Sequence, residues 1–253
     1  MDFQQLKMHQ LLKTRRNVIL LYIINMFFDL LFPKSCVGCK KIGRAICESC
    51  RKEIKPTLQD VCPYCFQNSP QGKTHDRCKH NNGLDGALSI VRYNKITQKI
   101  VKDIKYGLAY DVFNQVKEVL PVHWWRTEIY KKLPKDQTLI QPIPLHTSRK
   151  KVRGFNQAQI IADYLSHQTG IAMTDSVIRI KSTPPQARIS TKEERKKNIK
   201  GAFSVVNPEN IRGKIIILVD DIFTSASTAK ETAKVLKENG AETVLLYTFA
   251  HGS

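Results

Sequence analysis

Closely spaced cysteines constrain the first third of this chain more than any other sequence feature. Three pairs of cysteines are each separated by two residues, and a histidine followed by the seventh cysteine repeats that spacing. An odd number of cysteines does not fit a closed set of disulfides, whereas eight such ligands are enough for two tetrahedral zinc sites. We therefore predict two structural Zn²⁺ ions, held by Cys36, Cys39, Cys47, Cys50, Cys62, Cys65, His75 and Cys78.

The spacing leaves open how the eight ligands are shared between the two ions. Consecutive use would give one site with four cysteines and one with three cysteines and a histidine, whereas a cross-brace would interleave the pairs. His80 could replace His75, but only His75 repeats the two-residue spacing. Either arrangement fills all four positions with protein ligands, which predicts structural sites and not catalytic ones.

Four segments follow one another along the 253 residues. We expect an apolar N-terminal lead over residues 1–35, a zinc-binding module over 36–80 and a helical connector or hood over 81–137. Over residues 138–253, short β-branched runs alternate with helical patterns, which is typical of a mostly parallel sheet covered by helices. The predicted fold class is therefore α/β, with a small zinc-ribbon-like module at its N-terminus.

The N-terminal lead is open to three interpretations. Basic residues precede an apolar run over 18–32, as in a signal peptide, but no small-residue cleavage site follows. The run could instead be an amphipathic helix, packed on the domain or lying at a membrane surface, or translation could begin at Met26. It has no stretch of about 18 uncharged apolar residues, so we predict no membrane span and a cytoplasmic protein, with membrane association as the alternative.

Periodicity assigns the individual elements. The β-branched run Lys214–Val219 (KIIILV) is of the kind that is buried on both faces of a parallel sheet. Apolar residues at helical spacing begin at Ile96 and predict a helix that Gly107 ends. Further strands are predicted over 138–142, 177–180, 202–206 and 242–249, and further helices over 112–120, 124–133, 155–169 and 225–239.

A pair of acids and a series of small hydroxyl residues follow the central strand and lead into the predicted helix. A strand-to-helix turn directs unpaired backbone N–H groups and the positive end of the helix at one point, where Ser and Thr hydroxyls also donate to a phosphate. The acids would repel the phosphate itself, so we expect them to accept hydrogen bonds from sugar hydroxyls or to attract hydrated Mg²⁺. A plain turn followed by a helix N-cap is the alternative. The segment predicts a site for a phosphorylated sugar, formed by Asp220, Asp221, Thr224, Ser225, Ala226, Ser227 and Thr228.

The same segment resembles the phosphoribosyl pyrophosphate (PRPP) signature of type I phosphoribosyltransferases, except that Ala226 stands where that family usually has its first glycine. Upstream motifs extend the resemblance to the ComF family of phosphoribosyltransferase-like proteins. They are the proline-containing strand end Gln141–His146, the Arg-rich turn Arg149–Ala158 and the polar segment Thr183–Phe203. Together with the Cys-rich region, the similarity spans Leu30–Ala250.

The resemblance implies a role for each motif. The two acids would be the catalytic residues, and the loop after them would hold the 5-phosphate of PRPP. Residues after Pro144 would hold pyrophosphate, and the polar segment would close over the site and exclude water. The residues that would hold pyrophosphate are Leu145, His146, Arg149, Lys150 and Arg153. Those of the polar segment that would bind the ligand are Gln186 and Arg188. For the cations of both segments a solvated basic surface is the alternative, and for the cluster from Arg149 to Arg153 a nucleic-acid-binding patch is another. The implied reaction is pentosyl transfer, in which Mg²⁺ and basic side chains stabilise the pyrophosphate that leaves ribose C1.

Two classes of function remain. One is a PRPP-dependent phosphoribosyltransferase or PRPP-binding protein. The other, as ComF relatives imply, is a protein that handles single-stranded DNA in competence and DNA uptake, together with competence-type partner proteins. The formal charge of +19 suits anionic partners of either kind, and Trp124 and Trp125 would suit stacking on DNA bases. Residues 149–200 hold 12 Lys and Arg against 4 Asp and Glu, whereas residues 201–253 hold 5 against 6, so the 5-phosphate loop has to rely on backbone N–H groups.

Overall fold

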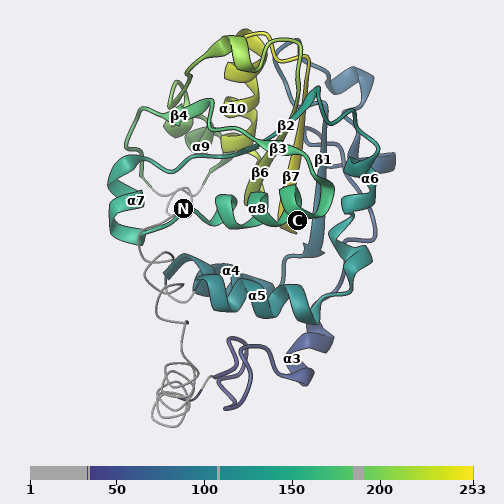
Figure 1. Cartoon of the computed structure of the whole chain (residues 1–253), viewed down its shortest axis with the longest axis vertical. Coiled ribbons are helices and arrows are strands. Elements are labelled where there is room, and N and C mark those ends of the chain that lie inside the picture. Colours follow the sequence, from purple (N-terminus) through teal and green to yellow (C-terminus); the bar gives the residue numbers. More distant parts are fainter. Residues whose placement is uncertain (1–32, 34, 107–108, 185–190, 253) are drawn as a thin grey trace, which may run out of the picture.

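A five-stranded parallel sheet forms the centre of the protein in a computed structural model, which describes residues 33, 35–106, 109–184 and 191–252 (Figure 1). The strand order is β1-β7-β6-β2-β3. Because β2, β6 and β7 are parallel neighbours, their carboxyl ends meet at one edge of the sheet. The strands are β1 (Gly86–Arg92), β2 (Thr138–Pro142), β3 (Ala172–Met173), β6 (Ile215–Phe223) and β7 (Thr243–His251).

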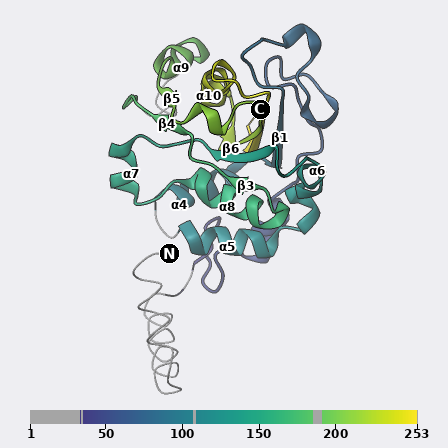
Figure 2. The same cartoon turned by 45° about the horizontal axis from the view of Figure 1, so that its top comes forward.

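Helices cover both faces of this sheet, so β6 is buried on both sides. Ile217 and Val219 pack into the core on one face, and Ile216 and Leu218 pack into the core on the other. This arrangement explains why the strand is apolar at successive positions. Figure 2 shows α4 (Lys95–Tyr106), α5 (Ala109–Val119) and α8 (Gln157–Thr169) on one side of the sheet, and α9 (Lys192–Ile199) and α10 (Ser227–Glu238) on the other.

Shorter elements complete the structure. Two strands outside the main sheet, β4 and β5, pair with each other in antiparallel orientation. There are also three short helices: α3 lies in the zinc region, α6 follows a 3₁₀ turn at Val122–Trp125, and α7 precedes α8. These elements are α3 (Glu48–Glu53), α6 (Thr127–Lys131), α7 (Thr147–Arg153), β4 (Val177–Arg179) and β5 (Phe203–Val205), with further 3₁₀ turns at Pro70–Gly72, Asp76–Cys78 and Pro208–Asn210.

The α/β class with a mostly parallel sheet is confirmed, as is helix α8, which Asn156 caps at its start and Gly170 ends in left-handed conformation. Two expectations need correction. Residues 81–137 were expected to be a helical connector or hood; α4, α5 and α6 do lie within them, but so does β1, which pairs with β7 at the edge of the main sheet. The strands predicted over 177–180 and 202–206 pair with each other in a separate two-stranded antiparallel sheet and do not extend the parallel sheet.

Strand β1 was missed because its seven residues carry no alternation that marks a strand. All but Arg92 are buried, and Ser89 is accommodated only because its hydroxyl lies 2.7 Å from that of Thr248 on β7. That partner lies 159 residues further along the chain. Strand pairing over such a distance cannot be read from a local pattern.

The helix predicted over 124–133 is confirmed only over α6, because the chain breaks at Arg126. This residue has a φ of 53° and separates the 3₁₀ turn at Val122–Trp125 from α6. Trp125 is fully buried, with its ring 4.5 Å from that of Tyr164. The prediction that Trp125 stacks on DNA bases is therefore wrong, because its ring is not accessible.

Some expectations fall on residues that the structure does not describe. They include most of the N-terminal lead and the helix stop at Gly107. Among the described helices, none is both long and apolar enough to cross a lipid bilayer.

Candidate functional site

The eight predicted zinc ligands gather in two groups of four. Cys36, Cys39, Cys47 and Cys50 form the first group, and Cys62, Cys65, His75 and Cys78 form the second. Within each group the ligand atoms all lie within 4.8 Å of one another. Zinc–sulfur and zinc–nitrogen bonds of about 2.3 and 2.0 Å place tetrahedral ligands roughly 3.5–3.8 Å apart, so both groups fit Zn²⁺. The ligands are thus arranged consecutively, with His75 and not His80 in the second site.

Hydrogen bonds prepare the ligands of the second site. The Nε2 atom of His75 lies 3.1 Å from the carbonyl oxygen of Asn68, which favours a proton on Nε2 and leaves Nδ1 free to bind metal. That Nδ1 atom lies 3.3 Å from the sulfur of Cys65. Burial alone would raise the pKa of the Cys62 thiol, but backbone N–H groups of Cys65, His75 and Tyr64 outweigh it and lower the pKa to about 7. A thiolate at this position suits zinc.

The two zinc sites contact different parts of the domain (Figures 1 and 2). Near the first site, the ammonium group of Lys99 on α4 donates to the carbonyl of Gly38. The second half of the zinc region runs beside β1, where the backbone N–H of Thr57 donates to the carbonyl of Ile90 at 3.0 Å. Each half of the zinc region therefore packs against the α/β domain, because it is too small to have a hydrophobic core of its own.

A cavity of about 460 Å³ opens beyond the carboxyl ends of β2 and β6, where the predicted sugar-phosphate site was expected. It is lined by most of the residues predicted for that site: Leu145, Arg149, Arg153, Asp220, Asp221, Thr224, Ser225, Ala226, Ser227 and Thr228. His146 and Lys150 do not line it. The imidazole of His146 instead caps α7 by accepting from the N–H of Ser148 at 3.3 Å, and Lys150 is exposed. Gln186 and Arg188 lie outside the described residues.

The loop between β6 and α10 has the form of an anion site. Ala226 adopts a φ of 53°, the left-handed conformation that glycine takes without strain, so the substitution noted in the sequence falls where glycine is favoured. Helix α10 begins at the next residue. The first N–H groups of a helix have no carbonyl partner one turn earlier. The N–H of Ser227 donates to the hydroxyl of Ser225 at 3.4 Å, whereas those of Thr228 and Ala229 offer donors at the cavity wall.

The two acids lie on β6 just before this loop and are half-buried. The carboxylate of Asp220 accepts from the backbone N–H of Asp221 at 2.8 Å. Carboxylate oxygens are the ligands that Mg²⁺ prefers, so the acid pair fits a cavity that would hold Mg²⁺ with a phosphorylated ligand.

Arg179 is a cavity residue that the sequence analysis missed. It lies on β4, it is only 9% exposed, and its Nη2 atom donates to the hydroxyl of Thr183 at 2.5 Å. Burial and the charge of Arg149 lower its pKa to about 10, although the charge of Asp220 acts in the opposite direction. On β4, Arg179 is buried like Val177 and Ile178 between them is exposed, but an alternation of only three residues is too short a signal to predict a buried charge.

Gln157, on the first turn of α8, was also missed. It is 3% exposed and lines the cavity. Its Oε1 atom accepts from Arg153 at 3.4 Å, which identifies the amide NH₂ as the other end of the side chain. That NH₂ group has no hydrogen-bond partner among the described residues. A buried donor without a partner beside a cavity points to a ligand atom that would accept from it.

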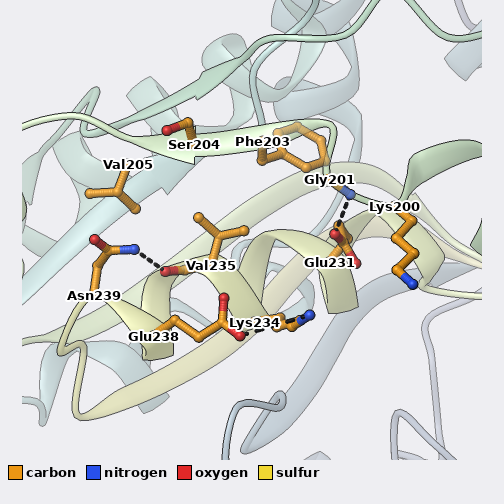
Figure 3. Close-up of a pocket in the computed structure, with 10 residues that line it drawn as sticks. All are labelled: Lys200, Gly201, Phe203, Ser204, Val205, Glu231, Lys234, Val235, Glu238 and Asn239. Atoms are coloured by element: carbon orange, nitrogen blue, oxygen red, sulfur yellow. Dashed lines mark hydrogen bonds and ion pairs between the residues drawn. The ribbon is translucent and has the colours of Figure 1, made fainter.

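A second hollow, of about 320 Å³, lies between β5 and α10 (Figure 3). Glu231 accepts there from the backbone N–H of Gly201 at 2.6 Å, and Lys234 pairs with Glu238 at 3.7 Å. Its charged side chains alternate in sign, so it has none of the anion preference of the larger cavity.

Comparison with known proteins agrees with this architecture. Residues 151–253 match the phosphoribosyl transferase domain, and residues 27–79 match the double zinc ribbon domain. The fold and the zinc ligands thus define a phosphoribosyltransferase-like protein with an N-terminal double zinc ribbon.

Relatives that match over most of their length identify the family. The DNA utilization protein YhgH of Salmonella typhimurium is 36% identical over 210 residues, which cover 80% of this chain and 88% of that protein. Competence protein F of Haemophilus influenzae is 26% identical over 227 residues, covering 87% and 97% of the two chains. Competence protein ComFC of Bacillus subtilis is 25% identical, covering 79% and 81%. The chain belongs to the ComF family.

Proposed function

We propose that this protein binds PRPP, or a related phosphorylated ribose, together with Mg²⁺ in the cavity beyond β2 and β6. It transfers the pentosyl group to an incoming nucleophile, which bonds to ribose C1 as pyrophosphate leaves. One observation carries the proposal. The cavity combines a helix N-terminus behind a hydroxyl-rich loop, a pair of acids and four arginines, which are Arg149, Arg153, Arg179 and Arg195. PRPP has the complementary groups: a monophosphate, a diol and a pyrophosphate.

The residues of the cavity divide the ligand between them. Backbone N–H groups and hydroxyls of the loop from Thr224 to Thr228 bind the 5-phosphate, which the acidic C-terminal segment could not hold by charge. Asp220 and Asp221 accept hydrogen bonds from the ribose hydroxyls or hold the metal. The arginines bind the pyrophosphate and stabilise its charge as it leaves. When bound, Mg²⁺ would neutralise part of that charge.

Calorimetric titration with PRPP and Mg²⁺ tests this proposal. The double variant Asp220→Asn and Asp221→Asn keeps the shape of the site but loses both charges, and we expect it to lose the binding heat. Asp175→Asn, at an exposed position outside the cavity, is the matched control and should titrate like wild type. A wild-type protein that gives no heat with PRPP and Mg²⁺ would refute the proposal.

A second candidate function, the handling of single-stranded DNA in competence or DNA uptake, is favoured by the basic surface beside the cavity. Lys150 and Lys151 on α7 are exposed, next to the arginines that line it, and Lys197, two residues after the cavity residue Arg195 on α9, is exposed as well. The relatives' names refer to competence and to DNA utilization. In this function the protein acts in the cytoplasm with competence-type partner proteins, and its seven free cysteines remain reduced and available to zinc.

Salt and the acid pair separate the two functions. Binding of a short single strand through these lysines should weaken steeply as salt rises, because each phosphate contact releases a counterion. The double Asp→Asn variant should bind the strand as well as wild type or better, because it removes two negative charges near the basic surface. DNA affinity that does not change with salt would exclude this function.

A further inference from the structure

The second zinc site is connected to the phosphate loop by a continuous set of side chains. Phe66 follows the zinc ligand Cys65 directly, and its ring stacks on that of Phe223 with the centroids 5.6 Å apart and the planes at 26°. Phe223 is the last residue of β6 and directly precedes Thr224, where the loop begins. Its other neighbour is His251 at the end of β7, whose ring lies 4.9 Å away. The strand end that carries the loop is therefore held between the zinc ribbon and β7.

A lysine connects the same parts at the other end of the loop. Lys230 lies on the first turn of α10, with its Nζ atom 4.8 Å from the ring centroid of Tyr64 and 5.4 Å from that of Phe66. The same Nζ atom donates to the carbonyl of Ser225 at 3.2 Å. An ammonium group close to two aromatic rings is attracted to them, so the rings of the zinc ribbon fix the position of the Lys230 ammonium group. That group in turn fixes the orientation of the Ser225 carbonyl.

The orientation of that carbonyl decides where the next N–H group points. The described peptide bonds are all trans, and the C=O and N–H of a trans peptide point in opposite directions. Because the Ser225 carbonyl faces Lys230, the N–H of Ala226 faces away from it. Ala226 lines the cavity. Lys230 thus helps to orient a backbone donor without touching the ligand itself.

The conformation of Phe66 depends on the metal ligands around it. Phe66 has a φ of 60°, an uncommon conformation for a bulky residue, and its N–H donates to the carbonyl of Cys62 at 3.0 Å. Lys40, the residue after Cys39 in the first site, has a φ of 64°, so the left-handed residue belongs to this type of zinc-binding turn. Such strain persists where surrounding bonds enforce it. Zinc bound by Cys62 and Cys65 would supply that constraint.

We infer that the second zinc ribbon positions the phosphate loop, and that Phe66 and Lys230 are positioning residues for the 5-phosphate of the ligand. The inference rests on the proposed function for its ligand. The first zinc site, which contacts α4 through Gly38 and Lys99, has no such connection among the described contacts and serves as the internal comparison.

Substitution of Lys230 tests the connection without changing a zinc ligand. In Lys230→Met we expect the Kd of ribose 5-phosphate to rise about tenfold and hydrogen exchange of the amides of residues 225–229 to become about tenfold faster. The Kd of magnesium pyrophosphate, which uses the arginines, should stay within about twofold. Lys230→Arg keeps the cation and should restore both values. Lys234→Met, one turn further along α10 at a position with an exposed ion pair, should behave like wild type.

Changes in the zinc ribbon give the second test. Phe66→Ala should reproduce the effect of Lys230→Met while both zinc ions stay bound, as metal analysis would show. Cys78→Ser in the second site should accelerate hydrogen exchange in the loop, and Cys39→Ser in the first site should not.

If Phe66→Ala and Lys230→Met leave hydrogen exchange in the loop at the wild-type rate, the inference is wrong. It is equally wrong if pyrophosphate binding weakens as much as ribose 5-phosphate binding, since that would indicate general destabilisation. If wild type binds no ribose 5-phosphate, the proposed function fails, and the exchange rates alone still decide whether the ribbon positions the loop.

Discussion

The guanidinium of Arg126 forms a two-point ion pair with the carboxylate of Asp60, which lies 66 positions earlier in the sequence. The Nη2 and Oδ2 atoms lie 2.8 Å apart, and the two side chains are 21% and 11% exposed. The pair joins the zinc ribbon to the domain at the point where the left-handed Arg126 breaks the predicted helix. The need to aim this side chain at Asp60 gives a reason for the break.

Removing one member of this pair should destabilise the protein markedly. In Arg126→Met the carboxylate of Asp60 would be left nearly buried without its partner, so we expect a loss of about 2–4 kcal/mol in the free energy of unfolding. Thermal or urea denaturation measures it. Lys234→Met breaks the exposed pair with Glu238 and should cost less than about 0.5 kcal/mol. Equal losses in the two variants would contradict this assignment.

Arg179 should contribute to ligand binding more than its place in a short strand suggests. It is buried beside Arg149 and close enough to Asp220 for their charges to interact, so an anion in the cavity would relieve the repulsion between the two arginines. We expect Arg179→Met to raise the Kd of PRPP at least tenfold in calorimetry. Arg212→Met, at an exposed position outside the cavity, should leave it unchanged. An unchanged Kd in Arg179→Met would exclude Arg179 from the binding site.

Substitution of Gln157 should weaken ligand binding without lowering the stability of the protein. Gln157→Leu removes a buried NH₂ group that has no described partner, so the variant should be as stable as wild type or slightly more stable. If the NH₂ group serves the ligand, the same variant should bind PRPP about tenfold more weakly. Gln159→Leu, on the exposed side of the same helix, should change neither property by much. A large loss of stability in Gln157→Leu would mean that the side chain is structural.

The left-handed conformation of Ala226 predicts how the loop tolerates other residues. Ala226→Gly relieves strain in the folded state but adds freedom to the unfolded chain, so unfolding free energy should change by less than about 1 kcal/mol. Ala226→Val places a β-branched residue where a positive φ is strongly disfavoured and should cost more than about 2 kcal/mol. Chemical denaturation of the two variants compares them directly. A valine tolerated as well as glycine would mean that the loop does not hold this conformation.

Local patterns predicted the parts of this protein whose chemistry is local. The Cys-x₂-Cys spacing predicted both groups of zinc ligands, and the apolar strand followed by acids and hydroxyls predicted β6, the loop and α10. Features that depend on distant partners were missed. Strand β1 depends on β7, and the break at Arg126 depends on Asp60. Arg179 lies in a strand of three residues, too short to show that its alternation turns a charge inward.

The measurement that tests the central proposal most directly is a crystal structure of the protein soaked with PRPP and Mg²⁺ in the presence of a short single strand of DNA. We predict density for PRPP in the cavity, with its 5-phosphate at the loop from Thr224 to Thr228, its ribose beside Asp220 and Asp221, and its pyrophosphate among the arginines. A cavity that stays empty at saturating PRPP, or that holds a phosphate of the DNA strand at the loop, would contradict the proposal.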